Sequence, residues 1–83
     1  MLEKKIKIAQ SAEHEFELAT MVVQAASQHR SVIHIAMGDK KVNAKSIMGM
    51  TYLTLMDGDE VTVTCEGEDE EKAMETMTAA LQK

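Results

Sequence analysis

The spacing of apolar residues changes several times along this chain, and the order of those changes restricts the fold more than any other feature. Residues 2–8 alternate between charged and mostly apolar positions, which is typical of a half-buried strand whose inner face carries Lys4, Ile6 and Ile8. From Leu18 onward the apolar residues recur at helical intervals instead. This predicts a helix over about 16–28 with one buried stripe: Leu18, Met21, Val22, Ala25 and Ala26.

The middle of the chain shows the pattern of a hairpin followed by a short helix. Val32–Met37 alternates again, and Gly38-Asp39 is a turn signal before a third strand over 41–44. Ser46 then precedes an apolar turn and is a candidate N-cap, because its hydroxyl oxygen can accept a hydrogen bond from a free amide of the helix. We expect that helix to end near Tyr52 or Leu53.

The last third of the chain predicts one strand and one helix. Alternation over 61–66 indicates a strand with three buried residues: Val61, Val63 and Cys65. The acidic run 69–71 favours the start of a helix, since a helix N-terminus attracts negative charge. The buried stripe expected on that helix is Ala73, Met74, Met77, Ala80 and Leu81.

These elements predict an α+β fold, an open-faced β-sandwich of order β-α-β-β-α-β-α with its helices on one face of an antiparallel four-stranded sheet. The 83 residues are enough for a single domain spanning 1–83. The chain has no proline and eight methionines, which we expect mainly to fill gaps in the core.

Charge and cysteine content exclude several classes of partner. A net charge of -5 opposes binding to nucleic acid, which requires a basic surface. No stretch reaches the roughly 20 apolar residues of a membrane span, and the first ten residues lack the apolar core of a signal peptide. A lone Cys65 cannot form an internal disulfide, which favours a reducing, cytoplasmic location.

Four segments of the sequence resemble the HPr family, the phosphocarrier proteins of the sugar phosphotransferase system. The strongest is KKVNAKSIMG at 40–49, which is similar to the regulatory-serine segment and especially to that of the catabolite-repression paralogue Crh. The others align in the same ungapped register: ATMVVQAAS at 19–27, DGDEVTV at 57–63 and GEDEEKAMETM at 67–77. The resemblance implies the same order of elements as the periodicity.

The same register exposes a departure at the site that carries phosphate in the family. The family's loop reads close to G-[IL]-H-A-R-P-A, whereas this chain has Glu15 for the histidine, Glu17 for the arginine and Leu18 for the proline. A phosphocarrier histidine attacks phosphorus through a ring nitrogen, and Glu15 has no comparable nitrogen. Carboxylates at 13, 15 and 17 would also repel an approaching phosphoryl group, so the degenerate loop predicts a chain with no catalytic residue.

His14 lies one position before that register and leaves an alternative open. It could accept a phosphoryl group only if the loop slipped by one residue, and the simpler interpretation is a loop histidine without a special role. The other histidines, His29 and His34, do not complete a recognisable ligand motif, so we expect no metal and no cofactor.

Ser46 has a second interpretation beside helix capping. The resemblance implies that HPr kinase/phosphorylase phosphorylates this serine with ATP, and that the product binds a transcription regulator such as catabolite control protein A. The helix dipole and Lys45 could stabilise the added charge. Glu17 opposes this, because it stands where the family places an arginine beside the serine.

An apolar patch for docking is expected around that serine. Phe16, Thr20 and Val23 recur at helical spacing on a second face of the first helix, and Ile47 and Met48 follow Ser46, although these two could equally be buried. The sequence therefore favours a regulatory interaction module that is not an enzyme. The alternatives are a phosphocarrier with an altered site at His14 and a scaffold that keeps only the fold.

Overall fold

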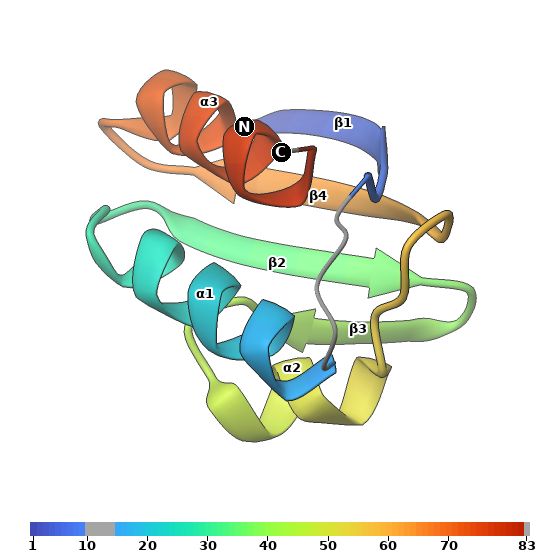
Figure 1. Ribbon diagram of the computed structural model, residues 1–83. Coiled ribbons are helices and arrows are strands. Elements are labelled where there is room, and N and C mark those ends of the chain that lie inside the picture. Colours follow the sequence, from blue (N-terminus) through green and yellow to red (C-terminus); the bar gives the residue numbers. More distant parts are fainter. Residues whose placement is uncertain (10–14, 83) are drawn as a thin grey trace.

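The two periodicities of the sequence produce four strands and three helices in the expected order (Figure 1). The structure is a computed structural model, and it describes residues 1–9 and 15–82. The elements are β1 (Leu2–Lys7), α1 (Glu15–Ser27), β2 (Val32–Met37), β3 (Lys40–Asn43), α2 (Ile47–Leu53), β4 (Glu60–Glu66) and α3 (Glu70–Leu81).

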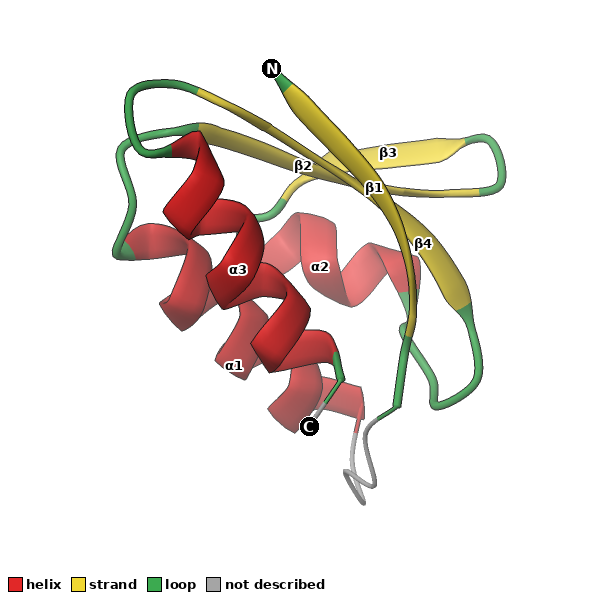
Figure 2. Ribbon diagram, turned by 90° about the horizontal axis from the view of Figure 1, so that it is seen from above, coloured by secondary structure: helices red, strands yellow, loops and turns green. Residues whose placement is uncertain are grey.

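The four strands form one antiparallel sheet in the order β1-β4-β2-β3, so the last strand of the sequence lies between the first two. All three helices cover the same face, which confirms the open-faced sandwich (Figure 2). Alternate residues of the central strand β4 point into the core because side chains on a strand alternate between its faces. Those residues are Val61, Val63 and Cys65, all buried as expected.

The core is filled from one face of each helix. On α1 the buried positions are Leu18, Ala19, Val22 and Ala26, while Met21 and Ala25 are only half-buried, so the stripe is rotated slightly from the one expected. On α3 the buried positions are Ala73, Met74, Met77 and Leu81. Burial raises the pKa of the Cys65 thiol, which fits a core residue and not a reactive one.

Three expectations about the strands need correction. Lys4 was expected on the buried face but is exposed, because β1 is an edge strand and a lysine there can lay its stem along the sheet while its ammonium reaches water. Ile8 and Ala44 are buried but lie just beyond the ends of β1 and β3. The third strand begins at Lys40, one residue earlier than expected, because Lys40 pairs with Met37 across the turn.

The carboxylate of Asp69 joins two connections that lie about 40 residues apart in the chain. It accepts hydrogen bonds from the backbone amides of Arg30 and Ser31, at 3.0 and 2.9 Å, and from the Ser31 hydroxyl. His29 Nδ1 lies 3.1 Å from the same carboxylate, and His29 Nε2 lies 2.9 Å from Thr76 Oγ1 on α3. The turn between α1 and β2 is thereby fixed to the start of α3.

Gly67 allows the same two connections to approach each other closely. Its φ of 154° is a conformation that side chains disfavour, and a Cβ built there would lie 2.8 Å from Ser31 Cα. Only glycine fits between β4 and α3 at this point.

Among the described residues, no helix is long and apolar enough to span a membrane.

We predict that Asp69→Asn lowers the free energy of unfolding at neutral pH and makes that free energy fall less steeply as the pH is lowered. The bonds to Ser31 and the neighbouring groups hold the pKa of Asp69 well below its usual range. A group with a lowered folded-state pKa stabilises the fold above its unfolded pKa of about 4, and that stabilisation is lost as pH falls through the folded pKa. Urea unfolding followed by circular dichroism between pH 7 and pH 2 measures this.

The matched control is Glu68→Gln, which removes the same charge one residue earlier in the same exposed connection. The native chain should lose more unfolding free energy than Asp69→Asn between about pH 5 and pH 2, whereas Glu68→Gln should follow the native chain. Equal acid losses in the native chain and Asp69→Asn would contradict the assignment.

Candidate functional site

The segment 43–50 holds Ser46 in the conformation of a helix cap, as the sequence predicted. Ser46 is extended, with φ −104° and ψ 117°, and its Oγ accepts a hydrogen bond of 3.2 Å from the Gly49 amide. Its carbonyl accepts the first helical bond, from Met50 N at 2.9 Å, and its amide donates to Asn43 O. The Ser46 side chain is half-buried, so its hydroxyl remains partly open to solvent.

Gly49 brings the first turn of α2 onto β3. A Cβ at this position would lie 3.1 Å from the Cβ of Val42, closer than side chains normally pack. The missing side chain therefore lets α2 pack directly against the hairpin. This holds Ser46 at the edge of the sheet formed by β3.

Lys45 connects the segment around Ser46 to the hydrogen-bonded cluster of His29, Ser31 and Asp69. Its Nζ donates a 2.7 Å hydrogen bond to the carbonyl oxygen of His29, and its own amide donates to Asn43 Oδ1. An ammonium group has three protons, so this bond leaves others for an anionic group nearby. The ammonium of Lys45, the residue before Ser46 in the chain, is therefore held against the α1–β2 turn.

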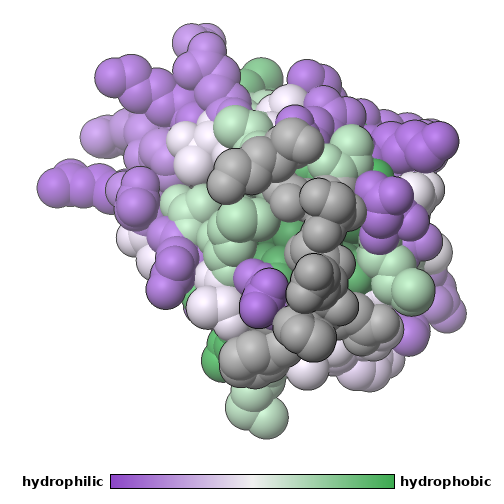
Figure 3. Space-filling model, viewed as in Figure 1, coloured by the Kyte–Doolittle hydropathy of each residue, from purple (hydrophilic) through white to green (hydrophobic). Residues whose placement is uncertain are grey.

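The two apolar residues directly after Ser46 are on the surface and not in the core. Ile47 is 38% exposed and Met48 is 83% exposed. The sequence left open whether these two side chains are buried, and the structure shows that they are not. Thr20 and Val23 are half-buried on α1, next to α2. On the face shown in Figure 3, apolar surface gathers over α1 and at the edge where α2 begins. The side chain of Phe16 lies outside the described residues.

Two further exposed apolar residues lie on α2 and just after it, and the sequence analysis missed them. Tyr52 is 61% exposed and Met56 is 55% exposed, and the Lys40 ammonium lies 4.9 Å from the centre of the Tyr52 ring. Tyr52 follows Met48 by one helical turn, a spacing that indicated a shared face. The signal was weak because an exposed and a buried apolar residue look the same in a helix this short.

The residues at the register of the family's phosphate-accepting loop include the start of α1. Glu15 is the first residue of the helix and Glu17 the third, and the Glu17 side chain is exposed. Leu18, which stands in place of proline, is buried in the core with 2% exposure. Glu13 and His14 lie outside the described residues, as does the side chain of Glu15.

The electrostatics of this helix start differ from those of an anion site. Free amides and the helix dipole attract negative charge at the first turn of a helix. Carboxylates already occupy positions 15 and 17 of the chain. Negative charge at such positions favours a helix start and disfavours the binding of an anion there. Within the described residues, no three His, Cys, Asp or Glu side chains are grouped as metal ligands.

The similarity of this chain to known proteins extends over its whole length. A family model described as PTS HPr component phosphorylation site matches residues 2–83. The HPr-like protein Crh of Halalkalibacterium halodurans is 39% identical over 83 residues, which cover all of this chain and 99% of that protein.

Two solved structures support the same similarity. The phosphocarrier protein HPr of Bacillus anthracis superposes with a TM-score of 0.91 at 34% identity, covering 98% of this chain and 96% of that one. The Bacillus subtilis catabolite repression protein Crh, solved as a swapped dimer, gives a TM-score of 0.73 at 38% identity over 99% of this chain and 90% of that one.

We predict that Ser46→Ala lowers the free energy of unfolding by about 0.5–2 kcal/mol, because the Gly49 amide loses its acceptor. Ser46→Asp should be nearly neutral, since aspartate is also a good cap and its charge suits a helix N-terminus. Thr51→Ala is the matched control: its hydroxyl donates to the Ile47 carbonyl within the same helix and caps nothing. Urea unfolding measures all three, and an equal loss in Ser46→Ala and Thr51→Ala would disprove the capping role.

Proposed function

The chain belongs to the HPr family, and from that membership we propose that it is a regulatory protein of catabolite repression and not a carrier of phosphate. It would act by docking through the surface around Ser46 on α1 and α2, with phosphorylation of Ser46 as the control. The relatives named Crh support this role, because they are HPr-like proteins whose name refers to catabolite repression.

The observation that carries the proposal is the glutamate at the register of the phosphate-accepting histidine. Glu15 begins α1, where the family's histidine would stand, and Glu17 replaces the arginine two residues later. A carboxylate in place of an imidazole removes the nitrogen nucleophile, and two negative charges make the approach of phosphate unfavourable. The fold is kept while the residues of phosphotransfer are not.

The geometry of Ser46 supports its use as a phosphorylation site. The cap uses Oγ only as an acceptor, so the hydroxyl proton is not needed to hold the helix. A phosphate there would add nearly two negative charges beside Lys45. HPr kinase/phosphorylase is the proposed donor enzyme, and catabolite control protein A or a similar transcription regulator is the proposed partner.

The exposed residues beside Ser46 supply the contact surface of this proposal. Met48 and Ile47 project from α2, and Thr20 and Val23 from α1 are partly accessible next to them. Exposed apolar side chains gathered around one polar residue are typical of protein interfaces. We place the protein in the cytoplasm, where its regulators act and where its thiol stays reduced.

Phosphotransfer from an altered site at His14 is the second candidate function. It rests on one histidine adjacent to the usual register. We consider it weaker, because the neighbouring carboxylates would oppose the reaction.

We predict that the chain accepts no phosphate from phosphoenolpyruvate through enzyme I, because its loop lacks both the nucleophile and the positive charge. Intact-mass measurement after incubation with both checks this. An acid-labile adduct on His14 would overturn the proposal in favour of the second candidate.

Two variants separate the nucleophile from the charge in this test. Glu15→His alone should restore little transfer, since Glu17 remains negative, whereas Glu15→His with Glu17→Arg should restore more. Equal rates for both would show that charge in the loop does not matter.

We predict that HPr kinase/phosphorylase and ATP add one acid-stable phosphate to the native chain and none to Ser46→Ala. Glu17→Arg should be phosphorylated faster than the native chain, and the difference should shrink as salt screens the charges. Glu75→Arg is the matched control, since it makes the same charge change on the exposed face of α3. If neither the native chain nor Glu17→Arg takes up phosphate, Ser46 is a helix cap only.

A further inference from the structure

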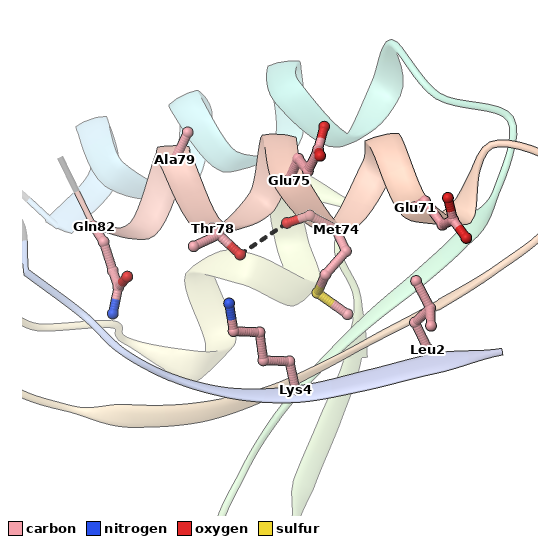
Figure 4. Close-up of a pocket in the computed structure, with 8 residues that line it drawn as sticks. All are labelled: Leu2, Lys4, Glu71, Met74, Glu75, Thr78, Ala79 and Gln82. Atoms are coloured by element: carbon pink, nitrogen blue, oxygen red, sulfur yellow. Dashed lines mark hydrogen bonds between the residues drawn. The ribbon is translucent and has the colours of Figure 1, made fainter.

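The methionines that fill the core are shielded from solvent. Met50 and Met77 are fully buried, and Met74 is almost so. Met74 lines a groove of about 430 Å³ between β1 and α3, where its thioether points toward β1 between the side chains of Leu2 and Lys4 (Figure 4). These sulfur atoms are therefore poorly accessible to a solute.

Three other methionines have most of their surface in solvent. Met1 is 75% exposed, Met48 is 83% exposed and Met56 is 55% exposed. The chain's only cysteine, Cys65, is buried in the core, and burial raises the pKa of its thiol, so the reactive thiolate is disfavoured. An oxidant in solution therefore meets thioether sulfur before it meets a thiol.

Met48 differs from the other exposed methionines in its position beside the proposed phosphorylation site. It is the second residue of α2 and follows Ser46 by two positions. Its neighbour Gly49 donates its amide to Ser46 Oγ, so Met48 belongs to the turn that the cap holds. Met1, in contrast, precedes β1 at the opposite edge of the sheet and is paired with Glu70. A chemical change at Met48 therefore alters the surface around Ser46, whereas the same change at Met1 does not.

The side chain of Met48 takes no part in holding α2. The start of the helix is fixed by the bond from the Gly49 amide to Ser46 Oγ and by the backbone bond from Met50 N to Ser46 O. Because Met48 is exposed, a polar group added to its sulfur stays hydrated and disturbs no core contact. Oxidation at this position is therefore compatible with an intact fold.

The reaction of a thioether with hydrogen peroxide is a two-electron oxidation of sulfur. A lone pair of the sulfur attacks one peroxide oxygen, the O–O bond breaks and an S–O bond forms, and the second oxygen leaves as water after proton transfer. The sulfur is oxidised and the peroxide is reduced. Methionine sulfoxide reductases reverse the change with electrons from thiols, which become a disulfide while the oxygen leaves as water. The product is a polar side chain in place of an apolar one.

We propose that Met48 is a reversible oxidation site, and that its sulfoxide hinders other proteins from docking on the surface around Ser46. The inference rests on the proposed regulatory function, because it adds a second control to the same surface. An apolar side chain favours an interface by leaving water, whereas a sulfoxide oxygen must give up its hydration to be buried there. Oxidation of Met48 would therefore slow the phosphorylation of Ser46.

The test treats the full 83-residue chain with hydrogen peroxide, removes the excess with catalase, and measures phosphorylation by HPr kinase/phosphorylase and ATP. Peptide mass mapping should find added oxygen on Met48 before it appears on Met50 or Met77. The oxidised chain should be phosphorylated about tenfold more slowly, a loss comparable to that of one buried apolar contact. Methionine sulfoxide reductase should restore the rate.

Three variants locate the effect. Met48→Leu keeps an apolar side chain without an oxidisable sulfur, so its rate should be the same before and after peroxide. Met1→Leu is the matched control: it removes a similarly exposed thioether at the opposite edge and should stay as sensitive to peroxide as the native chain. Met48→Gln places a polar amide near the position of the sulfoxide and should slow phosphorylation without peroxide. Urea unfolding should give the same stability for the treated and untreated native chain.

The possible outcomes separate this inference from the proposed function. Equal phosphorylation rates before and after oxidation of the native chain would overturn the inference and leave the regulatory proposal standing. A loss of rate in Met48→Leu as large as in the native chain, or a loss accompanied by a lower free energy of unfolding, would also overturn it. No phosphate on the untreated chain would overturn the regulatory proposal and this inference with it.

Discussion

The hydrogen bonds accepted by the Asp69 carboxylate are the interaction on which the relative placement of α1, β2 and α3 depends. The carboxylate binds the amides of Arg30 and Ser31 and thereby fixes the end of α1 and the start of β2 to the start of α3. The close contact requires Gly67, because any side chain there would overlap Ser31. His29 adds two hydrogen bonds to this cluster: its ring is bonded to the Thr76 hydroxyl, and its carbonyl oxygen accepts from the Lys45 ammonium. The Lys45 ammonium is therefore positioned by the same group of contacts that orients α3.

The order of the strands separates two surfaces that could serve different partners. Ser46 and the exposed residues of α2 lie at the β3 edge, whereas the groove beside α3 lies at the β1 edge. Two strands stand between them, so occupation of one surface leaves the other accessible. Contacts made at one edge of the sheet are thus structurally independent of contacts made at the other edge.

The start of α1 carries negative charge that suits the fold, whatever the function of the loop before it. Glu15 and Glu17 lie in the first turn of the helix, where negative charge is favourable for the helix itself. The same charges are unfavourable for a bound phosphoryl group. Leu18 gives up the fixed backbone of proline but adds a buried side chain to the core. Each of these residues is therefore acceptable for the stability of the fold, and the proposed loss of phosphotransfer requires no change in the architecture.

The sequence by itself determined the order of the elements, most of the buried residues and the cap at Ser46, because alternation, helical spacing and capping depend on neighbours in the chain. It did not determine whether Ile47 and Met48 are buried, since both faces of a two-turn helix can be apolar. It also could not indicate that Lys4 is exposed, because that depends on β1 being an edge strand. Only the tertiary structure decided the partners of Asp69 and the groove beside α3, because both depend on contacts between distant segments that the strand order brings together.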